Sequence, residues 1–164
     1  MKLEEKVVQQ LIKKKYHISF AESCTGGLTA ATIVSVADAS KVLDVSFVTY
    51  ADEAKIKYLG VKADIIAQFG VVSEEVAHQM AEGVAKEAGS EVGIGITGIA
   101  GPTGATATKP VGMVCFGICI NGQVKTYTMQ YGAIGRNEVR KKSVDFVLRQ
   151  LLEDMSSDAF KYSV

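Results

Sequence analysis

The spacing of apolar and polar residues predicts helices and strands that alternate along the chain. Apolar positions between Leu3 and Ile12 recur at helical spacing, whereas Ile18 and Phe20 alternate as in a short strand. The same pattern predicts helices over residues 3–15, 28–36 and 52–59, one from Ser73 onward, and a last one containing Val139, Phe146, Val147 and Leu151. It predicts strands over residues 18–22, 45–50, 92–97, 111–120 and 123–131.

Turn and capping residues mark several ends of these elements. Asp52 can cap the helix that ends before Gly60, and Ser73 is a good N-cap for the helix that follows it. The pair Asn121-Gly122 lies between two strand-like runs, which is a strong signal for a type I′ hairpin. Strands that alternate with helices and end in one hairpin therefore predict an α/β fold. We expect a three-layer α/β/α sandwich with a mixed, mainly parallel sheet and one antiparallel hairpin.

Length and composition indicate one globular domain. The chain has 164 residues, of which 48% are hydrophobic and 22% charged. We find no internal repeat or interdomain linker, so we expect a single domain over residues 1–164, with a tail after about Met155 that frays.

The charge balance and the absence of long apolar runs argue against nucleic acid and membranes as partners. Lys and Arg number 18, as do Asp and Glu, so the basic excess typical of phosphate-driven nucleic-acid binding is missing. No apolar run reaches the ~18 residues of a membrane span, and Met1 to Gln10 lacks the apolar core of a signal peptide. We therefore expect a cytoplasmic protein that binds neither nucleic acid nor membranes.

The cysteines and histidines suggest neither disulfides nor a metal site. Cys24, Cys115 and Cys119 form an odd and sparse set, and the last two fall in an apolar run where they are expected to be small buried hydrophobes. His17 and His78 are far apart in the sequence, so no zinc quartet is apparent. We expect neither a metal nor an organic cofactor.

The first segment that could carry chemistry is Ala21-Glu22-Ser23-Cys24-Thr25-Gly26-Gly27. It lies where a strand turns into a helix, a position at which open α/β sheets place their ligands. Ser23 could be a nucleophile, and the first N–H groups of the next helix could hold an oxyanion or a phosphate. Alternatively, Ser23 or Thr25 only caps that helix. Cys24 is a rival nucleophile, but no nearby histidine is evident to activate it.

The second segment runs from Val48 to Lys55 and contains Tyr50. If a helix begins at Asp52, Lys55 lies in its first turn, where the positive end of the helix dipole favours the neutral amine that a general base needs. The ordinary alternative is a solvated lysine on a polar helix face. Tyr50 could hydrogen-bond in a site or simply pack.

The third segment is a loop rich in glycine and threonine that begins at Thr97 and Gly98 and includes Gly101. Its N–H groups could form an anion-binding nest, but it has neither the Walker pattern nor the dinucleotide fingerprint. Taken alone, this loop is weak evidence for an anion-binding site. Arg136, next to Gly135 and just before a helix, could supply a cation for a phosphate, although such an arginine is more often a surface residue.

Together these segments resemble the C-terminal domain of the competence-damage protein CinA, which also occurs as a stand-alone nicotinamide-nucleotide amidase. The resemblance extends from about Lys2 to Leu152. It rests on AESCTGG at 21–27, FVTYADEAK at 47–55, LGV at 59–61, GVVSEEVA at 70–77, GITGIAGPTG at 95–104 and KPVG at 109–112. It implies hydrolysis of the carboxamide of nicotinamide mononucleotide (NMN) to nicotinate mononucleotide and ammonia, as a step of pyridine-nucleotide recycling.

The resemblance also implies a serine–lysine dyad, with Ser23 as nucleophile, Lys55 as base and Tyr50 supporting the proton network. Further site residues are expected around the small-molecule nucleotide. They are Cys24, Thr25, Gly26, Gly27, Thr97, Gly98, Gly101 and Arg136, with Arg140 as an alternative to Arg136 one helical turn away. The oxyanion donors are expected either near Cys24 to Gly26 or in the loop after Gly98.

One loop and two single residues depart from the family pattern. The loop from Thr103 to Thr108 is less rich in glycine than in many relatives, Met113 replaces a small polar residue, and Asp52 stands where asparagine is frequent. None of these changes affects the expected dyad. An amidase for another small carboxamide and a catalytically silent nucleotide-binding or regulatory domain are the competing hypotheses. The apolar composition is also compatible with a homodimer.

Overall fold

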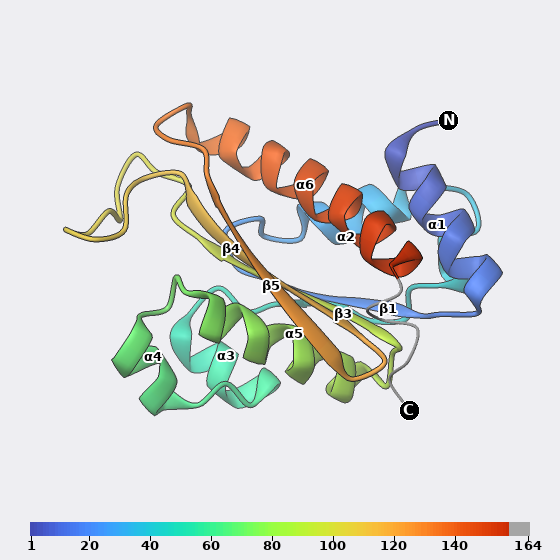
Figure 1. The fold of residues 1–164 in the computed structure, drawn as a ribbon, viewed down its shortest axis with the longest axis horizontal. Helices are drawn as coiled ribbons and strands as arrows, with labels where there is room; N and C mark the ends of the chain where they lie inside the picture. The colour runs from blue at the N-terminus through green and yellow to red at the C-terminus, as the bar shows by residue number, and fades with distance from the viewer. Residues whose placement is uncertain (158–164) are drawn as a thin grey trace.

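The computed structural model describes residues 1–157, which form one five-stranded sheet between two layers of helices (Figure 1). The order of the strands in the sheet is β2-β1-β3-β4-β5. Their bounds are β1 Ile18–Glu22, β2 Phe47–Val48, β3 Val92–Gly98, β4 Met113–Ile120 and β5 Gln123–Gln130. β1 pairs in parallel with β2 and β3, whereas β4 runs antiparallel to both β3 and β5. Four strands thus point the same way, and β4 and β5 form the hairpin.

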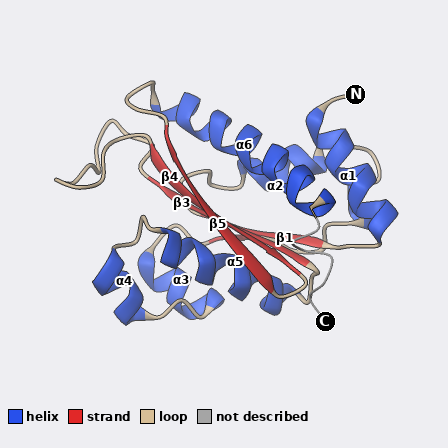
Figure 2. Ribbon diagram, viewed as in Figure 1, coloured by secondary structure: helices blue, strands red, loops and turns tan. Residues whose placement is uncertain are grey.

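Helices cover both faces of the sheet, as Figure 2 shows. One layer contains α1 (Leu3–Lys14), α2 (Leu28–Val34) and α6 (Arg136–Ser156), and a short 3₁₀ helix, η1 (Ala39–Lys41), follows α2. The other layer contains α3 (Asp52–Leu59), α4 (Ala63–Phe69) and α5 (Glu74–Ala88). The expected three-layer α/β/α sandwich with a mixed sheet is therefore confirmed.

Helix α5 lies unusually close to the sheet because the strands beneath it carry glycine. A Cβ atom added at Gly93 would lie 2.3 Å from the Ala81 carbonyl oxygen, and one at Gly95 or Gly117 would lie 2.6 or 2.3 Å from the Ala77 carbonyl oxygen. Real side chains do not approach a backbone so closely. These glycines therefore set the distance between α5 and the sheet, a role that the hydrophobic pattern did not indicate.

The expected turn and cap are present, and some boundaries differ from the expectation. Asn121 and Gly122 have φ of 50° and 83°, the two positive angles that a type I′ turn requires, and the Ser73 hydroxyl caps α5 by accepting from Val76 N at 3.2 Å. Asp52 does not cap α3. It is the first helical residue, and Ala51 occupies the N-cap.

Several predicted element ends were wrong. β2 is limited to Phe47–Val48, because only this pair reaches the register with Ala21 and Glu22. α2 ends at Val34, β4 begins only at Met113, and α4 was not predicted. α6 continues to Ser156, and most of the tail expected to fray lies outside the described residues.

The chain order of these elements creates a crevice at the carboxyl end of β1. After β1 the chain enters α2 on one face of the sheet, and after the neighbouring β2 it enters α3 on the other face. Helices that leave in opposite directions open a gap between adjacent strand ends, and ligands of open α/β sheets bind in such gaps. The residues that follow β1, β2 and β3 therefore meet at one place.

Candidate active site

Ser23 follows β1 directly and is fixed by the sheet. Its N–H donates to the Ile96 carbonyl at 3.1 Å, which continues the pairing of β1 with β3 by one residue. Gly26 and Gly27 then turn the chain into α2 with φ of 58° and 100°, angles that residues with a side chain rarely adopt. Only 9% of Ser23 is exposed to solvent. The serine is thus held in a nearly buried turn.

Glu22, which the sequence analysis did not single out, caps α2. Its carboxylate accepts hydrogen bonds from Thr29 N at 2.8 Å and Ala30 N at 3.0 Å, and the residue is 1% exposed. Gly27 occupies the N-cap position and supplies no side-chain bond. Neither Ser23 nor Thr25 caps the helix, so the alternative role considered for them was wrong. The two amides that Glu22 binds are not free to hold a substrate anion.

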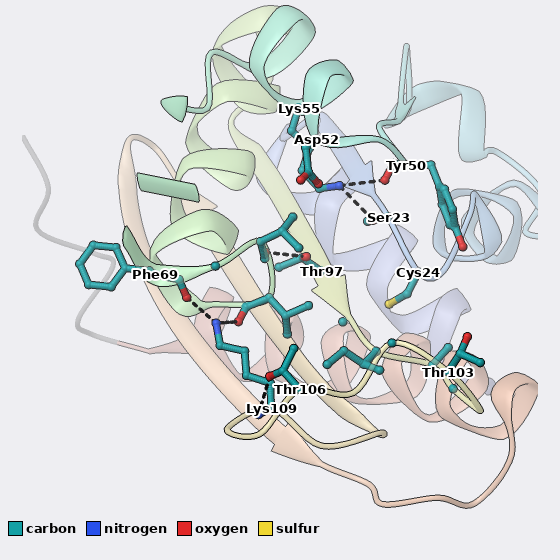
Figure 3. A pocket seen from close by; sticks show the side chains of 18 of the residues that line it. Ser23, Cys24, Tyr50, Asp52, Lys55, Phe69, Thr97, Thr103, Thr106 and Lys109 are labelled. Atoms are coloured by element: carbon teal, nitrogen blue, oxygen red, sulfur yellow. Dashed lines mark hydrogen bonds between the residues drawn. The ribbon is translucent and has the colours of Figure 1, made fainter. Parts of the chain in front are cut away.

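Lys55 extends from the first turn of α3 to the serine. Its Nζ atom donates to Ser23 Oγ at 3.2 Å and to the Tyr50 carbonyl oxygen at 3.1 Å (Figure 3). The residue is fully buried. Burial lowers the pKa of Lys55 below its ordinary value, an effect that nearby Asp52, Cys24 and Glu53 oppose. The neutral amine is therefore more accessible here than on a solvated lysine.

Cys24 is a less suitable nucleophile than Ser23. The pKa of its thiol is raised to about 11, chiefly by burial and also by Glu22, although the Cys24 backbone N–H, Arg140 and Lys55 act in the opposite direction. The thiolate is the reactive form of cysteine. At neutral pH this thiol stays protonated, so the environment favours the serine.

Ser23 and Lys55 lie at one end of a cavity of about 610 Å³. This volume falls within the usual range of small-molecule sites. Its walls come from the turn after β1, the start of α3, the α4–α5 connection, the loop after β3 and Arg136. Of the residues expected in the site, the cavity is lined by Ser23, Cys24, Tyr50, Lys55, Thr97, Gly98, Gly101 and Arg136. Thr25, Gly26 and Gly27 do not line it; they shape the turn that carries Ser23.

Tyr50 takes part through two different groups. Its main-chain carbonyl accepts from Lys55 Nζ, whereas its hydroxyl accepts from Arg136 Nη2 at 3.0 Å. The tyrosine is 60% exposed, so its ring lies at the rim of the cavity. The side chain therefore contacts the arginine rather than the dyad.

The structure distinguishes the two candidate arginines. Arg136 lines the cavity, and its Nη1 atom donates to the Gly101 carbonyl at 2.9 Å. Arg140 does not line it; its guanidinium donates to the Cys24 and Thr25 carbonyls at 3.1 and 3.0 Å. Arg140 thus stabilises the turn that carries Ser23 from outside the cavity, and Arg136 is the arginine that a ligand in the cavity could contact.

Two side chains on the far side of the cavity bind the connection between α4 and α5. The Thr97 hydroxyl donates to the Val71 carbonyl at 2.9 Å. Lys109 lines the cavity, and its Nζ atom donates to the carbonyls of Phe69 and Val72 (Figure 3). Lys109 was missed as a site residue, because the KPVG segment alone does not indicate where its ammonium goes.

Residues 1–157 contain neither a cluster of metal ligands nor a helix that could span a membrane. No three His, Cys, Asp or Glu side chains gather as a metal site would require. The helices of this part of the chain are all too short or too polar to cross a membrane.

The fold and the site together define a class: an α/β protein with a serine hydroxyl beside a buried lysine at the switch point of its sheet. The family model of the CinA C-terminal domain matches residues 1–155. The chain belongs to this family.

Named relatives agree with this assignment. A CinA-like protein of Kosmotoga olearia is 51% identical over 154 residues, and a putative competence-damage inducible protein of Clostridium perfringens is 46% identical over 153 residues. These matches include 92% and 93% of this chain but only 37% of either relative. The chain thus spans little more than a third of the curated proteins that it matches.

Solved structures have the same fold. A CinA superfamily protein from Klebsiella pneumoniae superposes with a TM-score of 0.90 at 34% identity, covering 94% of this chain and 96% of that one. The competence/damage inducible protein CihA from Agrobacterium tumefaciens gives 0.88 at 38% identity, covering 96% and 98%. The architecture is therefore that of the family throughout.

Proposed function

We propose that this domain hydrolyses the carboxamide of NMN to nicotinate mononucleotide and ammonia through a Ser23–Lys55 dyad. The observation that carries the proposal is the 3.2 Å contact between Lys55 Nζ and Ser23 Oγ, made by a fully buried lysine that lines the cavity. The substrate itself rests on the resemblance to nicotinamide-nucleotide amidases. The relatives are named for CinA or for competence and damage, and these names state no reaction.

Acylation begins with a proton transfer from serine to lysine. Neutral Lys55 accepts the Ser23 proton while Ser23 Oγ attacks the carboxamide carbon, which gives a tetrahedral intermediate. The Tyr50 carbonyl accepts another Nζ–H and so directs the lysine lone pair toward the serine. Burial of Lys55 supports this step, because it lowers the free energy needed to keep the amine neutral.

Protonated Lys55 then returns its proton to the departing nitrogen. The C–N bond breaks, ammonia leaves and an acyl-enzyme on Ser23 remains. Water adds to the acyl carbon with Lys55 again as base, which releases the carboxylate and restores the serine. The N–H groups of Gly26 and Ile99 already donate to the Ser23 and Met113 carbonyls. The predicted oxyanion donors are therefore the other main-chain N–H groups near Cys24 and in the loop after Gly98; one such donor is typically worth about 3–4 kcal/mol.

The charges around the cavity suit a phosphorylated substrate. Besides Lys55, which acts as a neutral base, the cavity is lined by two basic side chains, Lys109 and Arg136, and by one acidic side chain, Asp52. A guanidinium has five N–H donors, so the bonds from Arg136 to Gly101 and Tyr50 leave others for a phosphate. We assign the phosphate to Arg136. No metal or organic cofactor enters this mechanism.

A comparison of substrates tests the assignment. Purified protein is given NMN, nicotinamide riboside or nicotinamide at equal concentrations, and ammonia is measured with time. We expect kcat/KM to be highest for NMN. Equal values for NMN and the riboside would contradict the phosphate assignment and indicate an amidase for another carboxamide. Binding of NMN without ammonia release would indicate a silent binding domain.

The homodimer and the cytoplasmic location stay predictions. Cys24, Cys115 and Cys119 are all buried and unpaired, as is usual in a reducing compartment. Cell fractionation would test the location, and sedimentation of the purified protein would test the dimer.

A further inference from the structure

The connection between α4 and α5 is held by side-chain hydrogen bonds at four consecutive carbonyls. The Phe69 and Val72 carbonyls accept from Lys109 Nζ, the Gly70 carbonyl from Ser73 Oγ, and the Val71 carbonyl from Thr97 Oγ1. All four residues, Phe69 to Val72, line the cavity. We call this segment the Phe69–Val72 wall. Its carbonyls accept from these side chains and not from the main chain of a helix or strand, so the conformation of the wall depends on Lys109, Ser73 and Thr97.

Lys109 reaches this wall from a loop that projects from the body of the protein. The β3–β4 loop runs from residue 99 to 112, and Figure 1 shows it extending beyond the sheet. Every residue from Pro102 to Thr108 is exposed, yet several of them line the cavity. Two cations tie the loop to other elements, Arg136 through the Gly101 carbonyl and Lys109 through the α4–α5 connection.

Gly70, which lies against the Lys109 ammonium, leaves space for it because glycine has no side chain. Gly70 has a φ of 82°, and a Cβ atom there would lie 2.7 Å from Lys109 Nζ. Glycine therefore provides both the backbone angle and the space for the lysine head. The contact thus involves matched features on two segments that lie some 40 residues apart.

We propose that Lys109 is a positioning residue for the amide hydrolysis. Its ammonium joins the 99–112 loop to the Phe69–Val72 wall and so keeps closed the side of the cavity away from Ser23 and Lys55 (Figure 3). Lys109 does not touch the dyad. Its loss loosens the enclosure of the substrate and leaves the proton transfer between Lys55 and Ser23 intact. This inference rests on the proposed amidase function.

The test combines kinetics with hydrogen–deuterium exchange on Lys109→Met, using ammonia release from NMN. Exchange is expected to rise at amides of residues 69–72 and 99–112 and to stay unchanged in α1. KM is expected to rise about tenfold, as for the loss of a hydrogen bond to a charged group, with a smaller fall in kcat and an unchanged acidic limb of the pH–rate profile. Lys109→Arg, which keeps donors for both carbonyls, should restore much of the KM.

Lys13→Met is the matched control, because Lys13 is exposed on α1 in the other helical layer. It should behave as wild type in both measurements. Far-UV circular dichroism and thermal unfolding establish that each variant is folded; if Lys109→Met does not fold, Gly70→Ala disturbs the same contact from the opposite side and should give the same exchange pattern.

Two results would overturn the inference. One is wild-type exchange in both segments, and the other is increased exchange with unchanged KM. Failure of the proposed function is a separate result, since wild-type protein would then release no ammonia whatever the exchange data show. In that case Lys109 would join the two segments without serving this reaction, and the positioning role would fall with the activity.

Discussion

Lys55 Nζ and Ser23 Oγ lie 3.2 Å apart, although 32 residues separate them in the sequence. The parallel pairing of β1 with β2 brings them together, because Ser23 follows Glu22 and the Tyr50 carbonyl that orients Lys55 follows Val48 in the same register. The dyad is thus built from two neighbouring strand ends. This placement leads to several expectations about its chemistry.

Lys55→Met should abolish turnover without destabilising the protein. The substitution removes the proposed base; general acid–base catalysis contributes roughly 10²–10⁴-fold. It also replaces a fully buried amine with an apolar chain of similar length. Ammonia release and thermal unfolding would be measured beside Lys57→Met, an exposed lysine on the same helix. Near-normal activity of Lys55→Met would exclude lysine as the base.

The pH dependence of stability should reveal the lowered pKa of Lys55. Because its pKa in the folded state lies below the unfolded value, the unfolded chain binds more protons between the two values, and wild-type stability gains with rising pH across that window. Lys55→Met removes this gain. The stability advantage of the variant over wild type should therefore be largest below the folded pKa and shrink as the pH rises. A difference independent of pH would contradict the lowered pKa.

Cys24→Ala should keep most of the activity. The thiol pKa of about 11 leaves little thiolate at neutral pH, and Ser23 is the residue that contacts Lys55. Steady-state kinetics of the folded variant would provide the check. Complete loss of turnover with an intact fold would make cysteine the nucleophile.

Arg136→Ala should weaken the discrimination between NMN and its riboside. KM should rise for NMN and change little for nicotinamide riboside, because only the former offers a phosphate to the guanidinium. Arg140→Ala is an informative comparison, since Arg140 binds the Cys24 and Thr25 carbonyls and should affect both substrates alike. Parallel losses in Arg136→Ala would contradict its assignment to the phosphate.

Glu22→Ala should lower the free energy of unfolding by about 1–2 kcal/mol, the usual cost of removing a helix cap. The two amides at Thr29 and Ala30 lose their acceptor inside the protein. Glu22→Gln keeps one acceptor oxygen and should lose less. Denaturant unfolding, with Glu87→Ala on the exposed face of α5 as control, measures the difference. No loss in Glu22→Ala would show that the cap is not stabilising.

The sequence indicated the layers of the fold because its strands and longer helices have clear apolar patterns. Helix α4 was missed because it has only seven residues, too few for a clear helical period, and its apolar residues Ile65 and Ile66 are only partly buried against the core. Glu22 was missed as a cap because it lies five residues before the Gly27 N-cap. Only the folded turn between them brings its carboxylate to the helix N-terminus. The partners of Lys109 are 37 and 40 residues away, which no local pattern reveals.

For some site residues the sequence predicted only their place in the site, and the structure was needed to show which atoms they contact. The resemblance placed Ser23 and Lys55 in one site, and the structure brings them into contact. It gave Tyr50 a place in the proton network, but only geometry shows that its carbonyl meets Lys55 while its hydroxyl meets Arg136. The choice between Arg136 and Arg140 likewise required knowing which face of α6 borders the cavity. Their roles in turnover stay predictions.

The most direct measurement is ammonia release from NMN by purified wild-type protein, with Ser23→Ala run alongside under the same conditions. The account predicts steady release by wild type and none above background by the folded variant. Equal release by both would remove Ser23 as the nucleophile, and no release by folded wild-type protein would contradict the amidase itself.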